Sequence, residues 1–338
     1  MNFKPFRFPA LMAYALSATF YVAAQTPAPP PSVPAQAAET KDINEWLMRM
    51  HEASRNRSYV GTFVVSSGNA FSSAKIWHVC DGTQQMERVE ALTGPPRSTF
   101  RHNDQVVTFM PEKKLIRAEK RESLGLFPAL LKSTGSQIGD FYQARQEGHE
   151  RVAGVDADVI ALVPKDAMRF GYRVWAEQKK GLVVKLQTLD TDGKVLEQAA
   201  FSELQMDAPV KIEKLAQMMN KVDGYKVERS DLVKTTASAE GWALKKPVAG
   251  FKPMSCHKRP RGAQADEAPM QWVFSDGLAS VSIFVEPFDG KRHGRESRMS
   301  LGATQSLTRR VESYWLTVMG EVPMATLGLF ADGLERKK

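Results

Sequence analysis

The sequence predicts an α+β protein of two domains, both mainly antiparallel β-sheet. From residue 59 onward, apolar and polar residues alternate in many short runs, which is the period of a half-buried strand. Asp-Gly pairs at 81–82 and 192–193 separate such runs, and this pair readily forms tight hairpin turns. After the N-terminal segments about 300 residues remain, which is more than a single hydrophobic core usually serves. We therefore expect two domains, each with its own sheet.

Residues 1–24 have the layout of a secretory signal peptide. Lys4 and Arg7 precede an apolar stretch over 9–23, and Val-Ala-Ala at 22–24 has the small residues of a cleavage site. The alternative is a membrane anchor, but that would need about 20 unbroken apolar residues, and polar residues interrupt this stretch. We expect export and a soluble mature chain that begins at Gln25. Residues 25–41 follow as a proline-rich, extended tether.

The first domain is expected over residues 42–220 and opens with a short helix. Four apolar residues recur there at the spacing of one helical face, and Asp42 with Glu45 resembles a capping box. The four residues are Ile43, Trp46, Leu47 and Met50. Strands are expected at 59–66, 74–80, 84–92, 98–102, 105–110, 114–120, 159–163, 170–176, 182–189 and 195–204, which together predict an antiparallel meander.

An apolar segment at 124–131, with the sequence Leu-Gly-Leu-Phe-Pro-Ala-Leu-Leu, lies between the two groups of strands. It is too short for a helix that spans the sheet, so we expect it on the concave side of a curved sheet as a plug or lid. A helix with an apolar stripe from Ile212 to Met219 follows the last strand.

The polar stretch 221–240 is expected to be the linker, with a strand near 225–227, and residues 241–338 the second domain. Its expected elements are a β segment near Trp242, a loop that contains Cys256, strands at 271–274, 279–286 and 314–319, and a terminal helix that begins near Pro323. Residues 291–296 are expected to be a charged loop.

The chain is mildly basic, with a formal net charge of +8, and removal of Lys4 and Arg7 with the signal peptide leaves +6. The charges are scattered, and no recognition helix, zinc-finger spacing or RNA-binding motif accompanies them, so we expect no nucleic-acid partner. Two explanations remain for the basic surplus. It fits an acidic or phosphate-bearing partner, and it fits equally a solvated surface without a partner.

The two cysteines, Cys80 and Cys256, would reach an oxidising compartment on export. Because they fall in different halves of the chain, one disulfide would join the two domains, and such a long loop gives about 5 kcal/mol in the chain-entropy model. The alternative is two unpaired thiols, because the sequence does not show whether the pair is within bonding distance.

No pattern of catalytic residues is present, so we expect a protein that is not an enzyme and that needs no cofactor. The sequence has no G-x-S-x-G elbow, no C-x-x-C pair, no phosphate-binding glycine loop and no dinucleotide fingerprint. The six histidines are widely separated, so no metal site is expected. Cys256-His257 ends like a haem-attachment motif, but Pro253 stands where the first cysteine would be.

Large apolar residues on successive strands and on the segment 124–131 are the candidates for a lipid cavity. The candidates are Phe63, Trp77, Phe109, Leu126, Phe127, Leu130, Leu131, Phe170 and Trp175. A half-closed sheet with a loose plug makes a ligand cavity possible in principle. The alternative is a closed core with nothing bound.

Five segments, in this order and spacing, resemble a known family: the opening helix with Tyr-Val-Gly-Thr-Phe at 59–63, and residues 87–97, 192–198, 274–282 and 318–323. The family is MucB/RseB, periplasmic regulators of the envelope-stress sigma-E pathway. The resemblance covers nearly all of the mature sequence. It implies a first domain that is a half-open antiparallel barrel similar to the lipoprotein carriers (LolA-like), and a smaller mixed α/β C-terminal domain that binds a partner.

The resemblance also implies a function. The protein would bind the periplasmic domain of a membrane anti-sigma factor (RseA/MucA-like), shield it from regulated proteolysis, and release it when lipopolysaccharide or lipoprotein acyl chains occupy the large domain. The alternative function is a periplasmic lipid or lipoprotein carrier, which would need only the first domain. The partner-contact residues, the natural ligand and the oligomeric state, including a homo-oligomer, stay open at this point.

Overall fold

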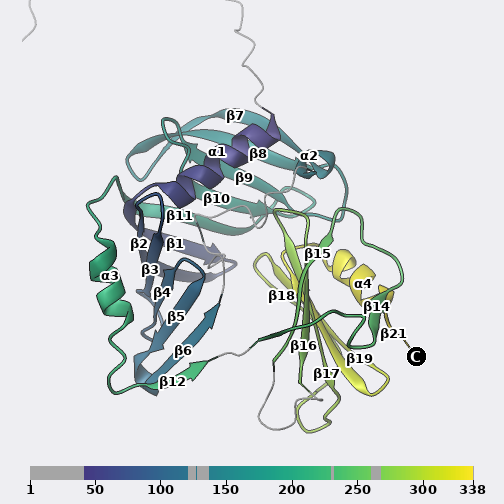
Figure 1. The fold of residues 1–338 in the computed structure, drawn as a ribbon. Helices are drawn as coiled ribbons and strands as arrows, with labels where there is room; N and C mark the ends of the chain where they lie inside the picture. Colours follow the sequence, from purple (N-terminus) through teal and green to yellow (C-terminus); the bar gives the residue numbers. More distant parts are fainter. Residues whose placement is uncertain (1–41, 121–126, 128–136, 230–231, 260–267, 338) are drawn as a thin grey trace, which may run out of the picture. The chain divides into compact units, whose positions relative to one another are not determined.

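The computed structural model describes residues 42–120, 127, 137–229, 232–259 and 268–337. Within these residues the chain forms one sheet of 12 strands and one sheet of 7 strands, and a two-stranded pairing completes the second half (Figure 1). Short helices accompany both sheets. The predicted class, mainly antiparallel β with few helices, is therefore confirmed.

The 12-stranded sheet is built almost wholly from residues 59–206. In sheet order its strands are β12 (Lys226–Arg229), β6 (Leu115–Lys120), β5 (Gln105–Met110), β4 (Ser98–His102), β3 (Gln85–Ala91), β2 (Ala70–Cys80), β1 (Tyr59–Ser67), β11 (Val195–Met206), β10 (Val183–Leu189), β9 (Gly171–Glu177), β8 (Val155–Pro164) and β7 (Tyr142–Val152). Neighbours pair antiparallel, except that β12 pairs in parallel with β6. Because β1 pairs with β11, the first strand of the meander β1–β6 lies beside the last strand of the meander β7–β11.

The expected strands of this sheet are present, and two of them, β4 and β5, have the predicted bounds. The strand β7 was not predicted, because it is an edge strand in which only Tyr142 is buried, so it has no apolar period. Both predicted Asp-Gly turns are also present. Gly82 and Gly193 have positive φ angles of 93° and 82°, which a tight hairpin turn needs.

Helix α1 (Ile43–Asn56) and helix α3 (Ile212–Met219) cover opposite faces of this sheet. Side chains alternate along β2: Ile76 belongs to the core that includes α1, whereas Val79 belongs to the core that includes α3. We call these two sides the α1 face and the α3 face. The expected capping box of α1 does not form, because the Asp42 carboxylate accepts a hydrogen bond from Asn44 and none from the backbone of the first turn.

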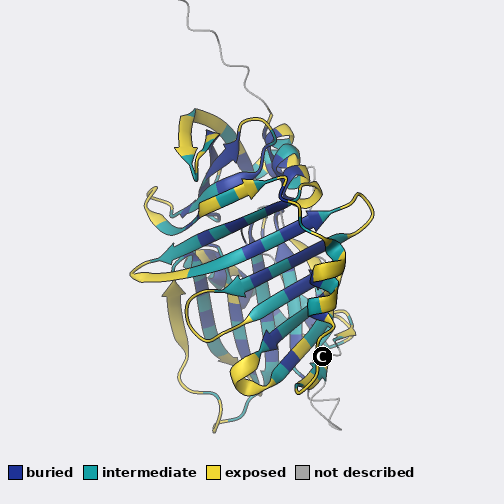
Figure 2. Ribbon diagram, turned by 90° about the vertical axis from the view of Figure 1, so that its left-hand side faces the viewer, coloured by how far each residue is buried: buried dark blue, intermediate teal, exposed yellow. Residues whose placement is uncertain are grey.

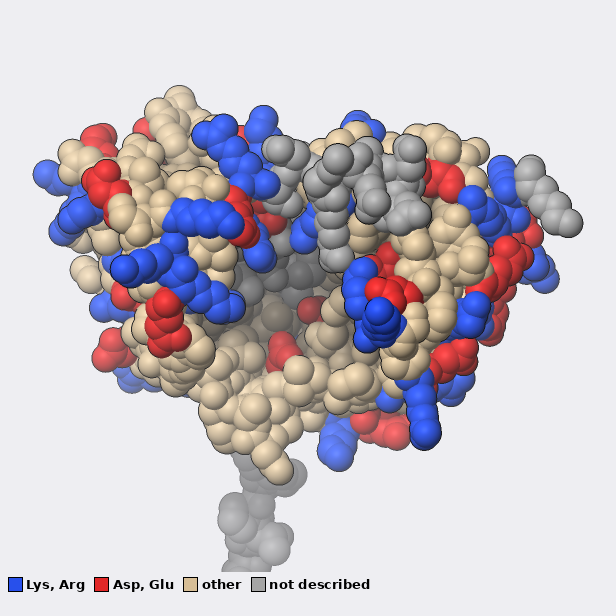
Figure 3. Space-filling model, turned by 90° about the horizontal axis from the view of Figure 1, so that it is seen from below, with Lys and Arg blue, Asp and Glu red and all other residues tan. Residues whose placement is uncertain are grey.

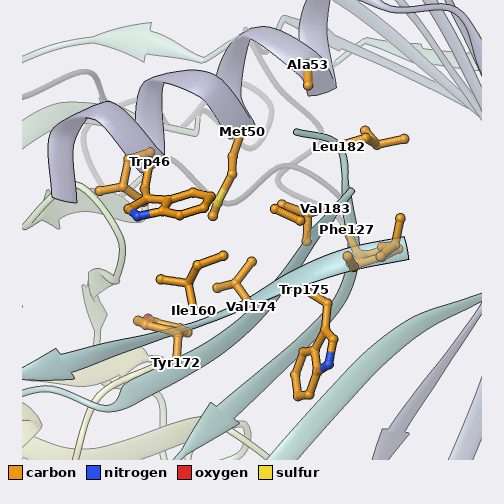
Figure 4. Packing of buried hydrophobic residues seen from close by; sticks show 14 of the residues in the cluster. Trp46, Met50, Ala53, Phe127, Ile160, Tyr172, Val174, Trp175, Leu182 and Val183 are labelled. Carbon is orange, nitrogen blue, oxygen red and sulfur yellow. The ribbon is translucent and has the colours of Figure 1, made fainter. Parts of the chain in front are cut away.

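The α1 face carries the larger core. Figure 4 shows Trp46 and Met50 of α1 above Ile160, Val174 and Val183 of the sheet. The other short helices of the described part of the first half are η1 (Pro111–Lys113) and α2 (Ile138–Phe141). Figure 2 shows buried and partly exposed residues alternating along the strands, as expected for a sheet with unequal faces.

The second half of the chain has its own sheet and core. In sheet order the strands are β13 (Val233–Lys234), β15 (Lys252–Lys258), β16 (Met270–Ser275), β17 (Ser280–Pro287), β20 (Tyr314–Gly320), β19 (Thr304–Val311) and β18 (Ser297–Leu301). The strands β14 (Trp242–Leu244) and β21 (Leu334–Arg336) pair with each other, and helix α4 (Met324–Gly333) precedes β21.

Several strands of this half differ from the sequence prediction. Cys256 lies in the strand β15 and not in a loop, and β18 and β19 form a hairpin that was not predicted. The residues of β15 and β18 are mostly polar, so neither strand shows a run of alternating apolar residues. The predicted terminal helix is confirmed as α4.

Candidate functional site

An aromatic cluster occupies the α1 face where β1 and β11 pair. The rings of Phe63 and Phe201 lie edge to face with centroids 6.2 Å apart, and the Tyr59 ring lies 6.4 Å from Phe201. Phe127 packs against both phenylalanines, at 5.5 Å from Phe63 and 4.9 Å from Phe201. All four side chains are buried. We call Tyr59, Phe63, Phe127 and Phe201 the aromatic cluster.

Phe127 differs from the other three because it does not belong to a strand of the sheet. It is the one residue of the apolar segment 124–131 that the structure describes, and it is 8% exposed. Its ring therefore fills space among rings that the sheet itself supplies. Removal of this ring would uncover apolar surface on Phe63 and Phe201.

Gly61 allows the Phe201 ring to lie close to β1. A Cβ atom at this position would lie 2.5 Å from a carbon of the Phe201 ring and 2.8 Å from the carbonyl oxygen of Glu203. Both separations are far below van der Waals contact, so only glycine permits this approach. The glycine at the centre of the 59–63 segment thus has a structural reason.

The predicted cavity residues do not all share one face of the sheet. Phe63 lies on the α1 face with Phe127, whereas Trp77 and Phe109 belong to the core under α3. Trp175 pairs across the sheet with Lys185 and points away from α1 (Figure 4). The strand register separates them, because neighbouring positions on a strand point to opposite faces.

The remaining predicted cavity residues are placed as follows. Phe170 is buried immediately before β9. Leu126, Leu130 and Leu131 lie outside the described residues. Two residues that sequence reasoning missed, Tyr59 and Phe201, complete the aromatic cluster. Phe201 lies opposite Phe63 across β1 and β11, and the Tyr59 ring contacts the Phe201 ring, so only the strand pairing reveals this role.

Buried polar groups close one end of the aromatic cluster. The Tyr59 ring stacks on His78 with centroids 4.9 Å apart, and Nδ1 of His78 donates to the carbonyl of Arg57 at 2.7 Å. Beside them, Arg101 pairs with Glu87 at 3.1 Å. Burial lowers the pKa of His78, and the Arg101 and Arg55 cations add to this, while Glu87 and the Arg57 carbonyl oppose it. His78 is therefore neutral at pH 7.

A second polar cluster links the first domain to the second. Arg169 precedes β9 and is fully buried; its Nε donates to Asp276 at 2.9 Å, and its other nitrogens contact Asp166 and the carbonyl of Ala249. Tyr142 of β7 donates to the same Asp276 oxygen at 3.1 Å. We call these residues the Arg169 cluster.

The Arg169 cluster is packed as well as hydrogen-bonded. The guanidinium carbon lies 4.3 Å from the ring centroid of Phe141 and 5.0 Å from that of Phe251, one from each domain. The other Asp276 oxygen accepts from the backbone N–H groups of Leu278 and Ala279, which fixes the β16–β17 turn. Leu278 itself packs into the core of the first domain. The contact between the domains is thus specific and buried.

An apolar groove of about 550 Å³ lies in the second domain, beside the linker. Trp242, Phe251, Trp272 and Phe274 line it, and Met254, which is 49% exposed, stands at its edge. Residues 234–238 of the linker form part of its wall. We call it the C-terminal groove.

The two cysteines are not bonded to each other. Both thiols are free: Cys80 ends β2 in the first sheet and is partly exposed, and Cys256 is buried in the core of the second. The predicted interdomain bridge is therefore absent from this structure. Burial, followed by the nearby Glu240 carboxylate, raises the pKa of Cys256 to about 11.

Among the described residues, no three His, Cys, Asp or Glu side chains gather as a metal site. Helices within the same residues are also too short or too polar to cross a membrane. Lys and Arg are interspersed with Asp and Glu on the face shown in Figure 3, so this face has no extended patch of one sign. The described residues thus form two apolar sites, the aromatic cluster and the C-terminal groove, and a buried contact between the domains, the Arg169 cluster.

Comparison with known proteins relates both domains to one family. The model of the MucB/RseB N-terminal domain matches residues 42–219, and the model of the MucB/RseB C-terminal domain matches residues 236–335. Together the two models match most of the chain.

The similar proteins include relatives of known name. The sigma factor AlgU regulatory protein MucB of Pseudomonas aeruginosa is 30% identical over 297 residues, which are 86% of this chain and 90% of that protein. The sigma-E factor regulatory protein RseB of Haemophilus influenzae is 24% identical over 293 residues, 86% of this chain and 90% of that protein. The solved complex of Pseudomonas aeruginosa MucA and MucB has a chain that is 26% identical, with a TM-score of 0.67 over 87% of this chain and 99% of that chain.

Proposed function

Because the chain belongs to the MucB/RseB family, we propose that it is a negative regulator of an envelope-stress sigma factor of the sigma-E type. The observation that carries the proposal is that both family domains match, in the family's order, over residues 42–219 and 236–335. A relative named as a sigma factor regulatory protein spans 86% of the chain. The protein acts by binding and not by catalysis.

The partner is the periplasmic part of a membrane anti-sigma factor, since a solved family member is in complex with MucA. The C-terminal groove supports this proposal, because its aromatic walls suit the apolar side chains of an extended polypeptide. An occupied groove would cover part of the bound segment and keep a protease from it.

Release of the partner depends on lipid at the aromatic cluster. Phe127, which itself belongs to no strand of the sheet, fills that cluster, so an acyl chain of lipopolysaccharide or lipoprotein takes its place among Phe63 and Phe201. By linkage, a lipid displaces the partner only if it binds the free protein more tightly than the complex. The Arg169 cluster joins the two domains and provides a physical route for this coupling.

The site of action is the periplasm. The layout of residues 1–24 supports export, and cleavage before Gln25 would release the mature chain. The two free thiols are compatible with an oxidising compartment, because the thiol of Cys256 is buried.

The second candidate function is a periplasmic carrier of lipids or lipoproteins. The aromatic cluster, taken alone, fits a carrier as well as it fits a regulator. The C-terminal groove and the whole second domain have no role in such a carrier, and this favours the regulator.

A protease-protection assay tests the proposal. The mature protein is mixed with the periplasmic segment of the cognate anti-sigma factor, and cleavage by the protease that starts its degradation is timed with and without lipopolysaccharide. We expect the protein to slow cleavage and lipopolysaccharide to restore it. Unchanged cleavage on addition of the protein, with acyl-chain binding intact, would instead identify a carrier.

Three variants connect the assay to the structure. Met254→Glu places a charge at the edge of the groove and should abolish protection, whereas Leu329→Glu, at an equally exposed position on α4, should not. Phe127→Ala should lower the lipopolysaccharide concentration needed for release, because the lipid no longer displaces a buried ring. Equal protection by the two glutamate variants would exclude the groove as the binding site.

A further inference from the structure

The two large sheets have four edge strands, and three of them are protected against pairing with another chain. An unprotected edge presents unpaired backbone N–H and C=O groups, and short length, charges and bulges are the usual protection. The edge strand β7 carries charges at 145, 147, 150 and 151 and an irregular register at Gly148. The edge strands β12 and β13 have four and two residues, and three of the four in β12 are charged.

The fourth edge, β18, is longer than β12 and β13 and carries a single charged residue, Arg298, and its turn at Gly302 lies beside Ser67 and Glu197. Its five residues, Ser-Arg-Met-Ser-Leu, are all exposed, and it pairs with β19 in regular register without a bulge or proline. Met299 and Leu301 are 65% and 72% exposed. Two large apolar side chains at alternate positions of a free edge strand are what a partner strand would cover.

The hairpin geometry shows which backbone groups are free. Gly302 and Ala303 form a two-residue turn that begins with a positive φ of 58° at Gly302, and the turn is closed by the pair Leu301 and Thr304. In such a hairpin the closing pair is hydrogen-bonded, and bonded pairs recur at every second residue. The backbone groups of Arg298 and Ser300 therefore point away from β19, toward the free edge.

The charge around β18 indicates the kind of partner. Lys291, Arg295 and Arg298 make no ion pair within the described part of the chain, and all three are exposed. The nearby Glu296 carboxylate is engaged by the backbone N–H of Arg310. Pairing with a second copy would bring two such basic edges together, whereas a partner strand with acidic residues would be attracted.

We propose that β18 is a docking edge, on which an extended segment of a partner protein, with alternating acidic and apolar residues, adds as a further strand. The acidic side chains lie beside Arg298, and the apolar ones cover Met299 and Leu301. The edge lies at the opposite end of the sheet order from β15 of the C-terminal groove, so the proposal is independent of the function proposed above.

The probe for the test is a fluorescent synthetic peptide of about eight residues, in which glutamate and valine alternate, and its lysine–valine counterpart. Binding to the mature protein is measured by fluorescence anisotropy. We expect saturable binding of the glutamate peptide and roughly tenfold or weaker binding of the lysine peptide. Arg298→Glu should reverse this preference, and Lys214→Glu on α3 should leave it unchanged.

Two variants separate strand addition from a general charge attraction. Ser300→Pro removes a backbone N–H that faces the free edge, and it should weaken binding of the glutamate peptide by roughly tenfold. Ser300→Ala removes only the hydroxyl, which bonds to Gln305, and should bind as the wild type does.

Three outcomes would overturn the proposal. They are absence of saturable binding, equal binding by the proline and alanine variants when both show native circular dichroism, and a dimer of the wild-type protein that Ser300→Pro dissociates. The last outcome would assign the edge to a second copy of the chain. None of these measurements involves an anti-sigma segment, so failure here leaves the proposed function untouched.

Discussion

Loss of the Arg169 guanidinium should destabilise the protein strongly and specifically at the contact between its domains. In Arg169→Met the Asp276 carboxylate, whose side chain is fully buried, would be left without its ion-pair partner. Removal of one partner of a buried pair typically costs about 3–5 kcal/mol. Methionine retains the apolar stem between Phe141 and Phe251, so the cost reports mainly on the charge.

The assay is urea unfolding at pH 7, followed by tryptophan fluorescence, with amide hydrogen exchange at the β16–β17 turn as a local probe. Arg173→Met is the matched control, because Arg173 pairs with Glu147 at a position 38% exposed, and exposed pairs contribute about 1 kcal/mol or less. Adding Asp276→Asn to Arg169→Met should recover part of the loss, since the unpaired charge is gone. An Arg169→Met protein within about 1 kcal/mol of the wild type, and no less stable than the control, would refute the reasoning.

Three further predictions concern single positions. Burial lowers the pKa of His78 below the unfolded value of 6.5, so the unfolded chain binds the proton more tightly than the folded protein does. The free energy of unfolding should therefore be highest above about pH 6.5 and fall as the pH drops. His78→Gln should flatten this pH dependence in urea melts between pH 7.5 and 5. Without a reductant, Cys80 should react with an alkylating reagent at pH 8, and Cys256 should react only after unfolding, because burial raises the pKa of Cys256 to about 11. A disulfide between the two cysteines, found by mass spectrometry, would contradict the structure. Gly61→Ala should cost about 1–3 kcal/mol, since its methyl group would overlap the Phe201 ring, and a thermal midpoint equal to that of the wild type would count against this packing.

The candidate site was predictable only in part. The segment 124–131 was expected to place apolar residues against the inside of the sheet, and Phe127 does lie among rings of the α1 face. Trp77 was expected beside it and belongs to the core under α3, whereas Trp175 points away from α1 but is buried in the same core as Phe63 and Phe127. A one-residue change in position along a strand reverses the face, and composition carries no information about that parity.

The elements with a clear period were predictable from local patterns. Strands with one buried face, amphipathic helices such as α3, and Asp-Gly hairpins all follow from neighbouring residues, because their geometry is set within a few residues of chain. The edge strands β7 and β18 were not predictable in this way, because a strand that buries few side chains shows no alternation of apolar and polar residues.

Local pattern also identified the family, and it predicts the export layout; both depend on residues close together in the chain. The pairing of Arg169 with Asp276, the closeness of Phe201 to Gly61 and the separation of Cys80 from Cys256 depend on residues that are far apart in sequence. Such contacts arise only when whole sheets pack, because the hydrophobic and electrostatic energies that select them are summed over the folded chain. For that reason the aromatic cluster, the contact between the domains and the free edge of β18 became visible only in the folded molecule.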